Sequence, residues 1–483
     1  MAKGVAKVWI SLIPVCVLII LLFITIRVFG SDALNGGSQI SLLIASSVCC
    51  AICIFGYGMK WQTFEKAINN TLVQIGSAII ILLLIGAISG VWMVSGVVPT
   101  LIYYGMQIIH PHYFLITTCI ICCLVSVMTG SSWTTIATIG IALLGIGKAE
   151  GFDGGWIAGA IISGAYFGDK ISPLSDTTVL ASSMAGTPLF THVRYMIITT
   201  VPSLSIALII FLIAGFSRQT TDLSQITFYT DILANRFDLS LWLLIIPVVT
   251  VFMIAKKVPA IVVLFLSVIM AGLFALFFQP DILTEIAGAK MISPNSLFKG
   301  FMCSIYGSTQ IETHHAEINS LLATRGMQGM LNTVWLILCA TCFGACMTVS
   351  GMLRSITSLF TRFTKTRVGL VSSTITSGVF LNAVVADQYM SIILTANMYR
   401  DVYDREGYEH RLLSRSIEDS STVTSPLIPW SSCGMTQATI LNIPTLTYLP
   451  YCFFNIISPF MSIFISILGY KIYRKKNTSE HSD

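Results

Sequence analysis

Long apolar segments recur along the whole chain and are separated by short polar stretches. A helix that crosses the hydrocarbon core of a bilayer needs about 20 mostly apolar residues, so each apolar segment of that length predicts a transmembrane helix. These segments are 8–28, 39–57, 74–96, 194–216, 238–255, 258–279, 330–350 and 447–469. The pattern therefore predicts a protein whose helices cross a membrane many times.

Four further apolar stretches are interrupted. Residues 112–147 and 367–398 contain polar residues near their midpoints, whereas 154–186 and 414–444 contain prolines. Proline removes a backbone donor and breaks a helix interior, so we predict a discontinuous helix in each stretch of the second pair. The first pair is expected to form helical hairpins. For 367–398, a re-entrant hairpin and a pair of spans are both compatible with the pattern.

The composition supports this membrane assignment. The 483 residues include 55% hydrophobic and 10% charged residues, and the mean hydropathy is +0.82. A soluble domain carries about 25% charged residues. We therefore predict one polytopic, all-α domain in a lipid bilayer. The net charge of +5 reports topology in such a chain, so no nucleic-acid partner is expected.

The positions of Lys and Arg predict the orientation. With the amino terminus inside, 19 of them fall on the cytoplasmic side and 7 outside, and Lys170 alone is placed within the membrane. Cytoplasmic loops are enriched in Lys and Arg. We therefore predict a multi-pass protein of the cell membrane with both termini cytoplasmic. The same count makes the two hairpins enter from opposite faces.

An internal repeat is suggested by sliding the chain against itself by 253 residues. This shift places Ser172-Pro173-Leu174 on Ser425-Pro426-Leu427, and it also places hairpin tip 129–135 on 382–388. Inverted-topology repeats with discontinuous helices are typical of secondary transporters. The predicted organisation is 1–73 for amino-terminal spans, 74–217 for repeat one, 218–329 for linking spans and an outside loop, 330–469 for repeat two, and 470–483 for a cytoplasmic tail.

Five acidic residues fall within or at the edge of membrane stretches: Asp169, Asp176, Asp387, Glu418 and Asp419. A charged residue at the centre of a membrane helix costs about 2.5–3.5 kcal/mol, so such residues indicate a functional site unless they are paired. Lys170 is the cation available to them, and we group it with Glu418 and Asp419 as charge-pairing residues. A purely structural ion pair of Lys170 with Asp169 or Asp176 is the alternative.

Oxygen-bearing side chains accompany these acids at the hairpin tips and helix breaks. Carboxylate, hydroxyl and carbonyl oxygens are hard ligands that suit an alkali cation. We therefore predict a site that binds Na⁺ or protons, with Na⁺ at Asp169 and Asp176. Hydroxyls can instead bond their own helix backbone. The further candidate ligands are Asp387, Thr129, Ser131, Ser132, Ser172, Asn382, Thr424 and Ser425. No histidine is expected in the middle of the membrane, and His192 is placed near the cytoplasmic interface.

The segment from Gly168 to Thr178, Gly-Asp-Lys-Ile-Ser-Pro-Leu-Ser-Asp-Thr-Thr, closely resembles the NhaC family of sodium/proton antiporters, as do 382–390 and 418–430. The resemblance implies sodium entry coupled to proton exit. It names Asp169 and Asp176 as the first binding residues and Asp387 as their counterpart in repeat two. It also implies no cofactor other than the transported Na⁺ and H⁺, and a homodimer of the larger ion transporter superfamily.

The expected function is therefore exchange of Na⁺ for H⁺ by alternating access. The main alternative is a Na⁺/H⁺-coupled exchanger of organic anions, of the malate/lactate type that the family also contains. Its mark would be a cavity where Asn382, Thr134 and helix amino-terminal ends leave room for a carboxylate. An enzyme is not expected: an intramembrane aspartyl protease would need a Gly-x-Gly-Asp sequence, and Asp169 follows Tyr166-Phe167-Gly168. A passive channel is disfavoured because paired broken helices suit alternating access.

Overall fold

The computed structural model describes residues 7–29, 36–108, 110–173, 175–216, 223–256, 258–315, 318–319, 322–360 and 364–475. These residues are nearly all helical, and their extended pairing is limited to two isolated bridges, Thr309–Thr324 and Tyr408–Arg474. The basic residues Lys3, Arg218, Lys257, Arg362 and Lys476 of the orientation count lie outside the described residues.

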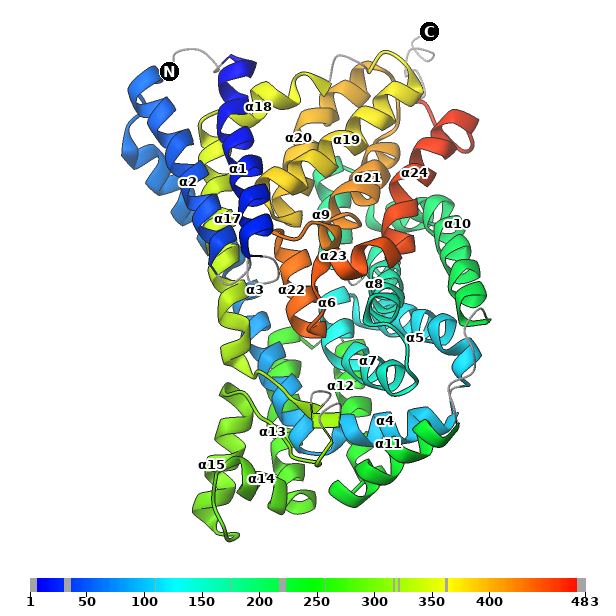
Figure 1. Ribbon diagram of the computed structural model, residues 1–483. Coiled ribbons are helices and arrows are strands. Elements are labelled where there is room, and N and C mark those ends of the chain that lie inside the picture. The colour runs from blue at the N-terminus through cyan, green and yellow to red at the C-terminus, as the bar shows by residue number, and fades with distance from the viewer. Residues whose placement is uncertain are drawn as a thin grey trace.

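The helices are given in chain order, and the α labels are those of Figure 1, whereas η marks the 3₁₀- and π-helices. The first half contains α1 (Val8–Phe29), α2 (Gly37–Ala51), η2 (Ile52–Gly56), α3 (Trp61–Val94), α4 (Val97–Ile108), η3 (Pro111–Tyr113), α5 (Phe114–Thr129), α6 (Ser132–Thr135), η4 (Ile136–Gly140), α7 (Ile141–Ala149), α8 (Gly154–Ile171), α9 (Asp176–Ala185), α10 (Leu189–Phe216) and α11 (Leu223–Arg236). The second half contains η5 (Leu241–Leu244), α12 (Ile245–Ala255), α13 (Ala260–Phe278), α14 (Pro280–Ile286), α15 (Pro294–Tyr306), η6 (Met327–Met330), α17 (Leu331–Val349), α18 (Met352–Thr357), α19 (Arg367–Val385), α20 (Gln388–Arg405), α21 (His410–Ile417), η8 (Glu418–Thr422), η9 (Ser425–Leu427), α22 (Ser432–Leu441), α23 (Thr445–Tyr448), η10 (Leu449–Tyr451) and α24 (Phe453–Leu468).

Eight helical segments of the described chain are long and apolar enough to cross a membrane, and the number is up to 11 if each of three bent helix pairs counts as one span. This confirms a polytopic helical membrane protein. Both arms of the first hairpin, Pro111–Thr129 and Ser132–Ala149, pass this test, as does α19 in the second. The bend of 67° between α3 and α4 occurs at Ser95-Gly96, where Gly96 has φ 84°.

The region 218–329, predicted as linking spans and an outside loop, also contains the shorter helices α14 and α15, which the apolar pattern did not predict. Pro294 occupies the first turn of α15, and Ser293 forms a capping box with Ser296, so this helix has a well-defined start. α15 packs against α3. Gly90 of α3 permits the contact, because a Cβ atom there would lie 2.0 Å from the carbonyl oxygen of Ser304.

The two hairpins turn in the same way. α5 ends before Gly130, which has left-handed backbone angles, and Ser131 then caps α6. α19 ends before Ala386, which is also left-handed, and Asp387 caps α20. In the sequence, the left-handed residues Gly130 and Ala386 are separated by three positions more than the 253-residue shift of the predicted repeat.

Both proline-containing stretches are discontinuous, as predicted. α8 ends at Ile171, and Ser175 caps the new helix α9. In the other stretch, α21 continues into the π-helix η8 and the short 3₁₀-helix η9, after which Ser431 caps α22. Backbone groups that leave a helix within a membrane must be satisfied by other protein groups or by water. These breaks are therefore the places where a polar site can form.

α8 lies between α5 on one side and the α23–α24 segment on the other (Figure 1). Its glycines allow this close packing, as small residues do between membrane helices. A Cβ atom on Gly164 would lie 2.2 Å from the carbonyl oxygen of Cys119 in α5, and one on Gly159 would lie 2.4 Å from the carbonyl oxygen of Tyr451.

We therefore expect Gly164→Val to destabilise the protein by about 1–3 kcal/mol, the usual cost of overpacking a core. The backbone carbonyl that it would meet cannot move as a side-chain tip can. Gly56→Val is the matched control, because a Cβ atom on Gly56 has no neighbour within 4 Å. Thermal unfolding of the purified protein in detergent measures both variants, and equal melting temperatures for the two would contradict this packing argument.

α18, the turn between α20 and α21, and the end of α24 lie at one end of the molecule, and α4, α11, α14 and α15 lie at the other (Figure 1). Residues after α24 pair with the α20–α21 turn, since the amide of Lys475 donates to the carbonyl of Gly407 at 2.9 Å. The Lys475 side chain also donates to Asp404 and holds the pKa of Asp404 below its usual value.

Candidate functional site

The first candidate site, called here the first junction, is where the tip of the first hairpin meets the end of α8. Asp169, in the last turn of α8, is 4% exposed. Ser132 at the start of α6 donates a hydrogen bond to Oδ2 of Asp169 at 2.7 Å. Within the described chain, the other oxygen, Oδ1, is buried and accepts no hydrogen bond. One carboxylate oxygen of this junction is therefore available to a cation or a proton.

Asp176 lies on the other side of the same helix break, at the start of α9, and it is exposed. The negative charge of Asp176 acts electrostatically on the carboxylate of Asp169. The hydroxyl of Tyr389, from the second hairpin, donates to Oδ2 of Asp176 at 2.7 Å. Tyr389 was not among the residues predicted from the sequence, although it follows Asp387 by two residues within the stretch 382–390 that resembles the family.

The second junction joins the tip of the second hairpin to α22. Asp387 is 8% exposed, and its Oδ1 accepts from the amide of Met390 at 3.0 Å. Ser432, at the start of α22, donates to Oδ2 of Asp387 at 3.3 Å. Each junction is therefore held by a Ser–Asp hydrogen bond between a hairpin tip and a broken helix. The carboxylate comes from the broken helix in the first junction and from the hairpin in the second.

Asn382 connects α19 to the second broken helix. Its Nδ2 donates to the carbonyl of Ser421 and, at 3.3 Å, to the hydroxyl of Thr424. Oδ1 of Asn382 and Oγ of Ser425 are buried and have no hydrogen-bond partner among the described residues. These two oxygens and Oδ1 of Asp169 are the predicted ligand atoms that the structure leaves uncommitted.

Several other candidate hydroxyls bond the nearby backbone, which is the alternative that the sequence analysis kept open. Thr424 donates to the carbonyl of Ser420 at 2.6 Å, and Ser172 donates to the carbonyl of Val127 at 2.8 Å. Thr129 donates to the carbonyl of Ser126 at 3.4 Å and also bonds the hydroxyl of Thr135 at 3.2 Å. Ser131 accepts from the amide of Thr134 at 3.2 Å as the cap of α6. These four residues hold the shape of the breaks and hairpin tips.

A cluster of buried charges lies beside the first junction, and we call Lys170, His192, Arg415, Glu418 and Asp419 the charged cluster. Lys170 forms an ion pair with Asp419, and both side chains are fully buried. The structural alternative of a pair with Asp169 or Asp176 is therefore wrong, because Lys170 pairs with the other half of the chain. Lys170 also donates to Ser458 at 2.7 Å.

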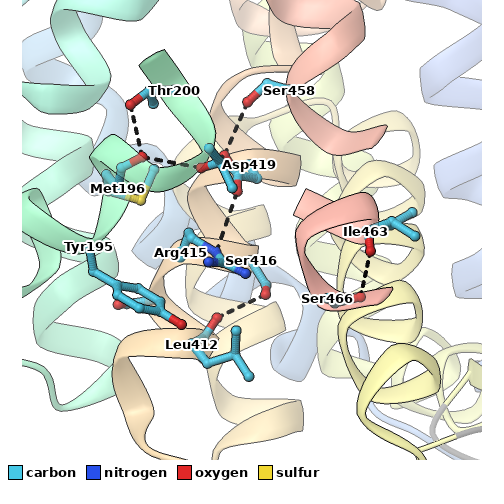
Figure 2. Close-up of polar contacts among 12 residues, drawn as sticks. Tyr195, Met196, Thr200, Leu412, Arg415, Ser416, Asp419, Ser458, Ile463 and Ser466 are labelled. Carbon is cyan, nitrogen blue, oxygen red and sulfur yellow. Dashed lines mark hydrogen bonds and ion pairs between the residues drawn. The ribbon is translucent and has the colours of Figure 1, made fainter. Parts of the chain in front are cut away.

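Arg415 is a second buried cation, which the sequence analysis had counted with the cytoplasmic loops. Its side chain is 0% exposed, its Nε is 4.0 Å from Oδ2 of Asp419, and its guanidinium lies 4.8 Å from the ring of Tyr195. Figure 2 shows Asp419 between Ser458 and Arg415, with Tyr195 beside the guanidinium. Lys170 is therefore not the only cation inside the protein.

His192 and Glu418 complete the cluster. His192 was expected near the interface but is 0% exposed, and its Nδ1 lies 2.8 Å from the hydroxyl of Ser414. Glu418 is also 0% exposed, and within the described residues neither of its carboxylate oxygens has a hydrogen-bond partner. Charges in a protein interior are normally paired or hydrogen-bonded, so Glu418 stands out.

Among the described residues, no group of three or more His, Cys, Asp and Glu side chains could hold a metal ion. The first junction offers one or two carboxylates together with hydroxyl and backbone carbonyl oxygens. Such a ligand set suits an alkali cation better than a transition metal.

Buried carboxylates at helix breaks within a polytopic helical bundle define the class of secondary transporters. The chain belongs to the Na⁺/H⁺ antiporter family, whose sequence profile matches residues 164–470. The resemblance based on residues 168–178 is thereby confirmed.

Similar proteins cover most of the chain. The Na⁺/H⁺ antiporter NhaC of Alkalihalophilus pseudofirmus is 36% identical over 89% of this chain and 91% of its own length. The malate-2H⁺/Na⁺-lactate antiporter of Bacillus subtilis is 36% identical over 87% of each chain. The arginine/ornithine antiporter ArcD of Halobacterium salinarum is 32% identical over 96% of this chain and 93% of its own. All three similar proteins are antiporters.

Proposed function

We propose that this protein exchanges Na⁺ for H⁺ across the cell membrane by alternating access, with Na⁺ bound at Asp169 and Asp176. The observation that carries the proposal is the buried Asp169 at a helix break, with one oxygen held by Ser132 and the other uncommitted. The family membership and the 36% identity to an NhaC antiporter support it. Na⁺ and H⁺ are the transported ions, and we propose no cofactor.

Two neighbouring carboxylates can bind either a sodium ion or protons. Asp169 is buried and Asp176 is exposed, so a sodium ion that approaches through water meets Asp176 first and then the desolvated Asp169. The hydroxyl of Tyr389 already donates a hydrogen bond to one carboxylate oxygen of Asp176. Because Tyr389 belongs to the second hairpin, ion binding at Asp176 affects a contact between the two halves of the chain.

We further propose that 74–217 and 330–469 are repeats of opposite orientation, with re-entrant hairpins at 112–147 and 367–398. The shared order of elements, the left-handed residue at each hairpin tip and the Ser–Asp bond at each junction support this. Positive-inside counting supports cytoplasmic termini. A homodimer is part of the same proposal.

Organic-anion exchange is the second candidate, because the malate/lactate antiporter is as similar to this chain as the sodium antiporter NhaC of A. pseudofirmus. A cavity of about 620 Å³ between α17–α18 and α19–α20 also contains Arg354, Asn397 and Arg405, which are suitable groups for a carboxylate. Asn382 and Thr134, the residues named from sequence for such a site, do not line this cavity.

Transport by purified protein in liposomes that contain a pH dye tests both candidates. Added Na⁺ is expected to drive proton movement without any organic acid. Proton movement that requires malate, lactate or a basic amino acid would instead favour the exchanger of organic substrates. Sodium uptake with no accompanying proton movement under any of these conditions would contradict the proposed function.

A further inference from the structure

We infer that Glu418 is a proton-binding site separate from the sodium site at Asp169 and Asp176, and that repulsion between the two sites couples the ions. This inference rests on the proposed function. In a model with shared sites, Asp169 and Asp176 would bind both ions in turn. In the inferred mechanism, sodium binds at Asp169 and Asp176, whereas the exchanged proton binds at Glu418.

The position of Glu418 is unusual in two respects. It opens the π-helix η8, a rare helical form that often occurs at functional sites. It is also 0% exposed, and both carboxylate oxygens lack a hydrogen-bond partner among the described residues. Burial without hydrogen bonds penalises the ionised form of a carboxylate much more than its neutral form. Glu418 therefore has a physical reason to take up a proton.

The surrounding charges have the opposite effect and keep the proton exchangeable. Asp169 and Lys170 of α8 and Asp419 of η8 itself act electrostatically on Glu418. The elements packed against η8 are α9, α19, α20, α21 and α24. Their titratable and charged groups are Asp176 of α9, Arg367 of α19, Tyr389, Tyr399, Arg400, Asp401, Tyr403, Asp404 and Arg405 of α20, and His410, Arg411 and Arg415 of α21, whereas α24 carries none. His192 and Tyr195 of α10 lie close to the charged cluster. Lys170 and Arg415 are two cations, whereas Asp419 is one anion.

With Glu418 ionised, the two cations Lys170 and Arg415 balance the two anions Asp419 and Glu418, and the sum of the four charges is zero. With Glu418 protonated, the same four residues carry one uncompensated positive charge. Desolvation favours the protonated state of Glu418, whereas charge balance favours its ionised state. A modest change in the charge nearby can therefore switch Glu418 between the two states.

A sodium ion at the first junction supplies that change. Glu418 of η8 and Asp169 of α8 are both buried and interact electrostatically. A cation at Asp169 therefore repels the positive charge that protonation of Glu418 would leave uncompensated, and the proton is released. At an effective dielectric constant of about 20, such an interaction changes an affinity about tenfold or more.

The experiment compares Glu418→Gln with wild type in liposomes, using full-length protein and two readouts. The first is exchange of radioactive sodium for unlabelled sodium at equal pH, which needs no proton. The second is sodium-driven proton movement. Because Gln mimics the protonated state, we expect Glu418→Gln to keep sodium–sodium exchange within about twofold at saturating sodium but to bind sodium about tenfold more weakly. We expect it to lose at least about tenfold of the proton movement, the change that one pKa unit represents. The sodium affinity of the variant is expected to lose its pH dependence.

Glu150→Gln is the matched control, because Glu150 is equally buried but lies at the end of α7, away from the charged cluster. It should retain both readouts. Sodium-driven proton movement at the wild-type level in Glu418→Gln would overturn the inference, and so would loss of both readouts in a variant whose melting temperature is unchanged.

If Glu418→Gln does not fold, Glu418→Asp provides the test, since it keeps the carboxylate but moves it within the cluster. A shifted pH midpoint of proton movement is then expected, and a midpoint identical to wild type would overturn the inference. Absence of sodium-driven proton movement in wild type itself would count against the proposed function, so the two failures are distinguishable.

Discussion

Asp169→Asn is expected to reduce sodium-driven proton movement about 10- to 100-fold. The substitution keeps the size of the side chain and the hydrogen bond from Ser132, but it removes the charge from the buried oxygen that has no partner. Contacts to a charged group contribute about 1.5–3 kcal/mol, which corresponds to that range of affinities. Pyranine-type pH recording in liposomes, with sodium concentration varied, measures the effect.

The control for this substitution is Asp153→Asn on the same helix. Asp153 caps the start of α8 by accepting from the amide of Gly155 at 2.9 Å, and Asn caps helices equally well. Transport by Asp153→Asn should therefore equal that of wild type. Equal transport by Asp169→Asn and Asp153→Asn would remove Asp169 from the binding site.

Lys170→Met should cause the largest loss of stability, about 3–5 kcal/mol, because it leaves Asp419 buried with part of its compensating charge gone. Replacing both members of a buried ion pair by apolar residues is often nearly neutral. The double variant Lys170→Met with Asp419→Leu should therefore recover part of the lost stability, although Arg415 also loses its ion pair with Asp419. Thermal unfolding in detergent measures all three proteins.

A double variant that is no more stable than Lys170→Met would show that the pair is not the source of the effect. Transport should fail in the double variant even where stability is recovered, since Lys170 and Asp419, two charges that act on Glu418, are then both missing. Stability and transport are thus separable at this position.

Much of the fold follows from the pattern of apolar residues. Span positions depend on the length of each apolar segment, and the helix breaks depend on proline, so both could be predicted locally. α14 and α15 were missed because their sequences are amphipathic and short, and they do not satisfy a rule based on continuous apolar length. The Ser293–Ser296 capping box and Pro294 were the local signals available.

The sequence was sufficient to predict which residues form the site, but not which residues they pair with. The cost of placing an acid in a membrane identifies Asp169, Asp387, Glu418 and Asp419 without any structure. Their pairings depend on how distant helices pack, and the sequence carries no direct sign of that. Arg415 was misassigned for a related reason: a positive charge near a membrane end usually faces the cytoplasm, whereas here the packing of α10 against α21 encloses it.

The ion pair between Lys170 and Asp419 also affects how the protein is made. The two residues are 249 positions apart, and ribosomes add about 5–20 residues per second, so Lys170 is synthesised about 12–50 s before its partner exists. During that interval the first half of the chain carries a lysine whose burial is uncompensated. We therefore expect a waiting stage in membrane insertion after the first half is complete, which ends when the segment around Asp419 reaches the bilayer.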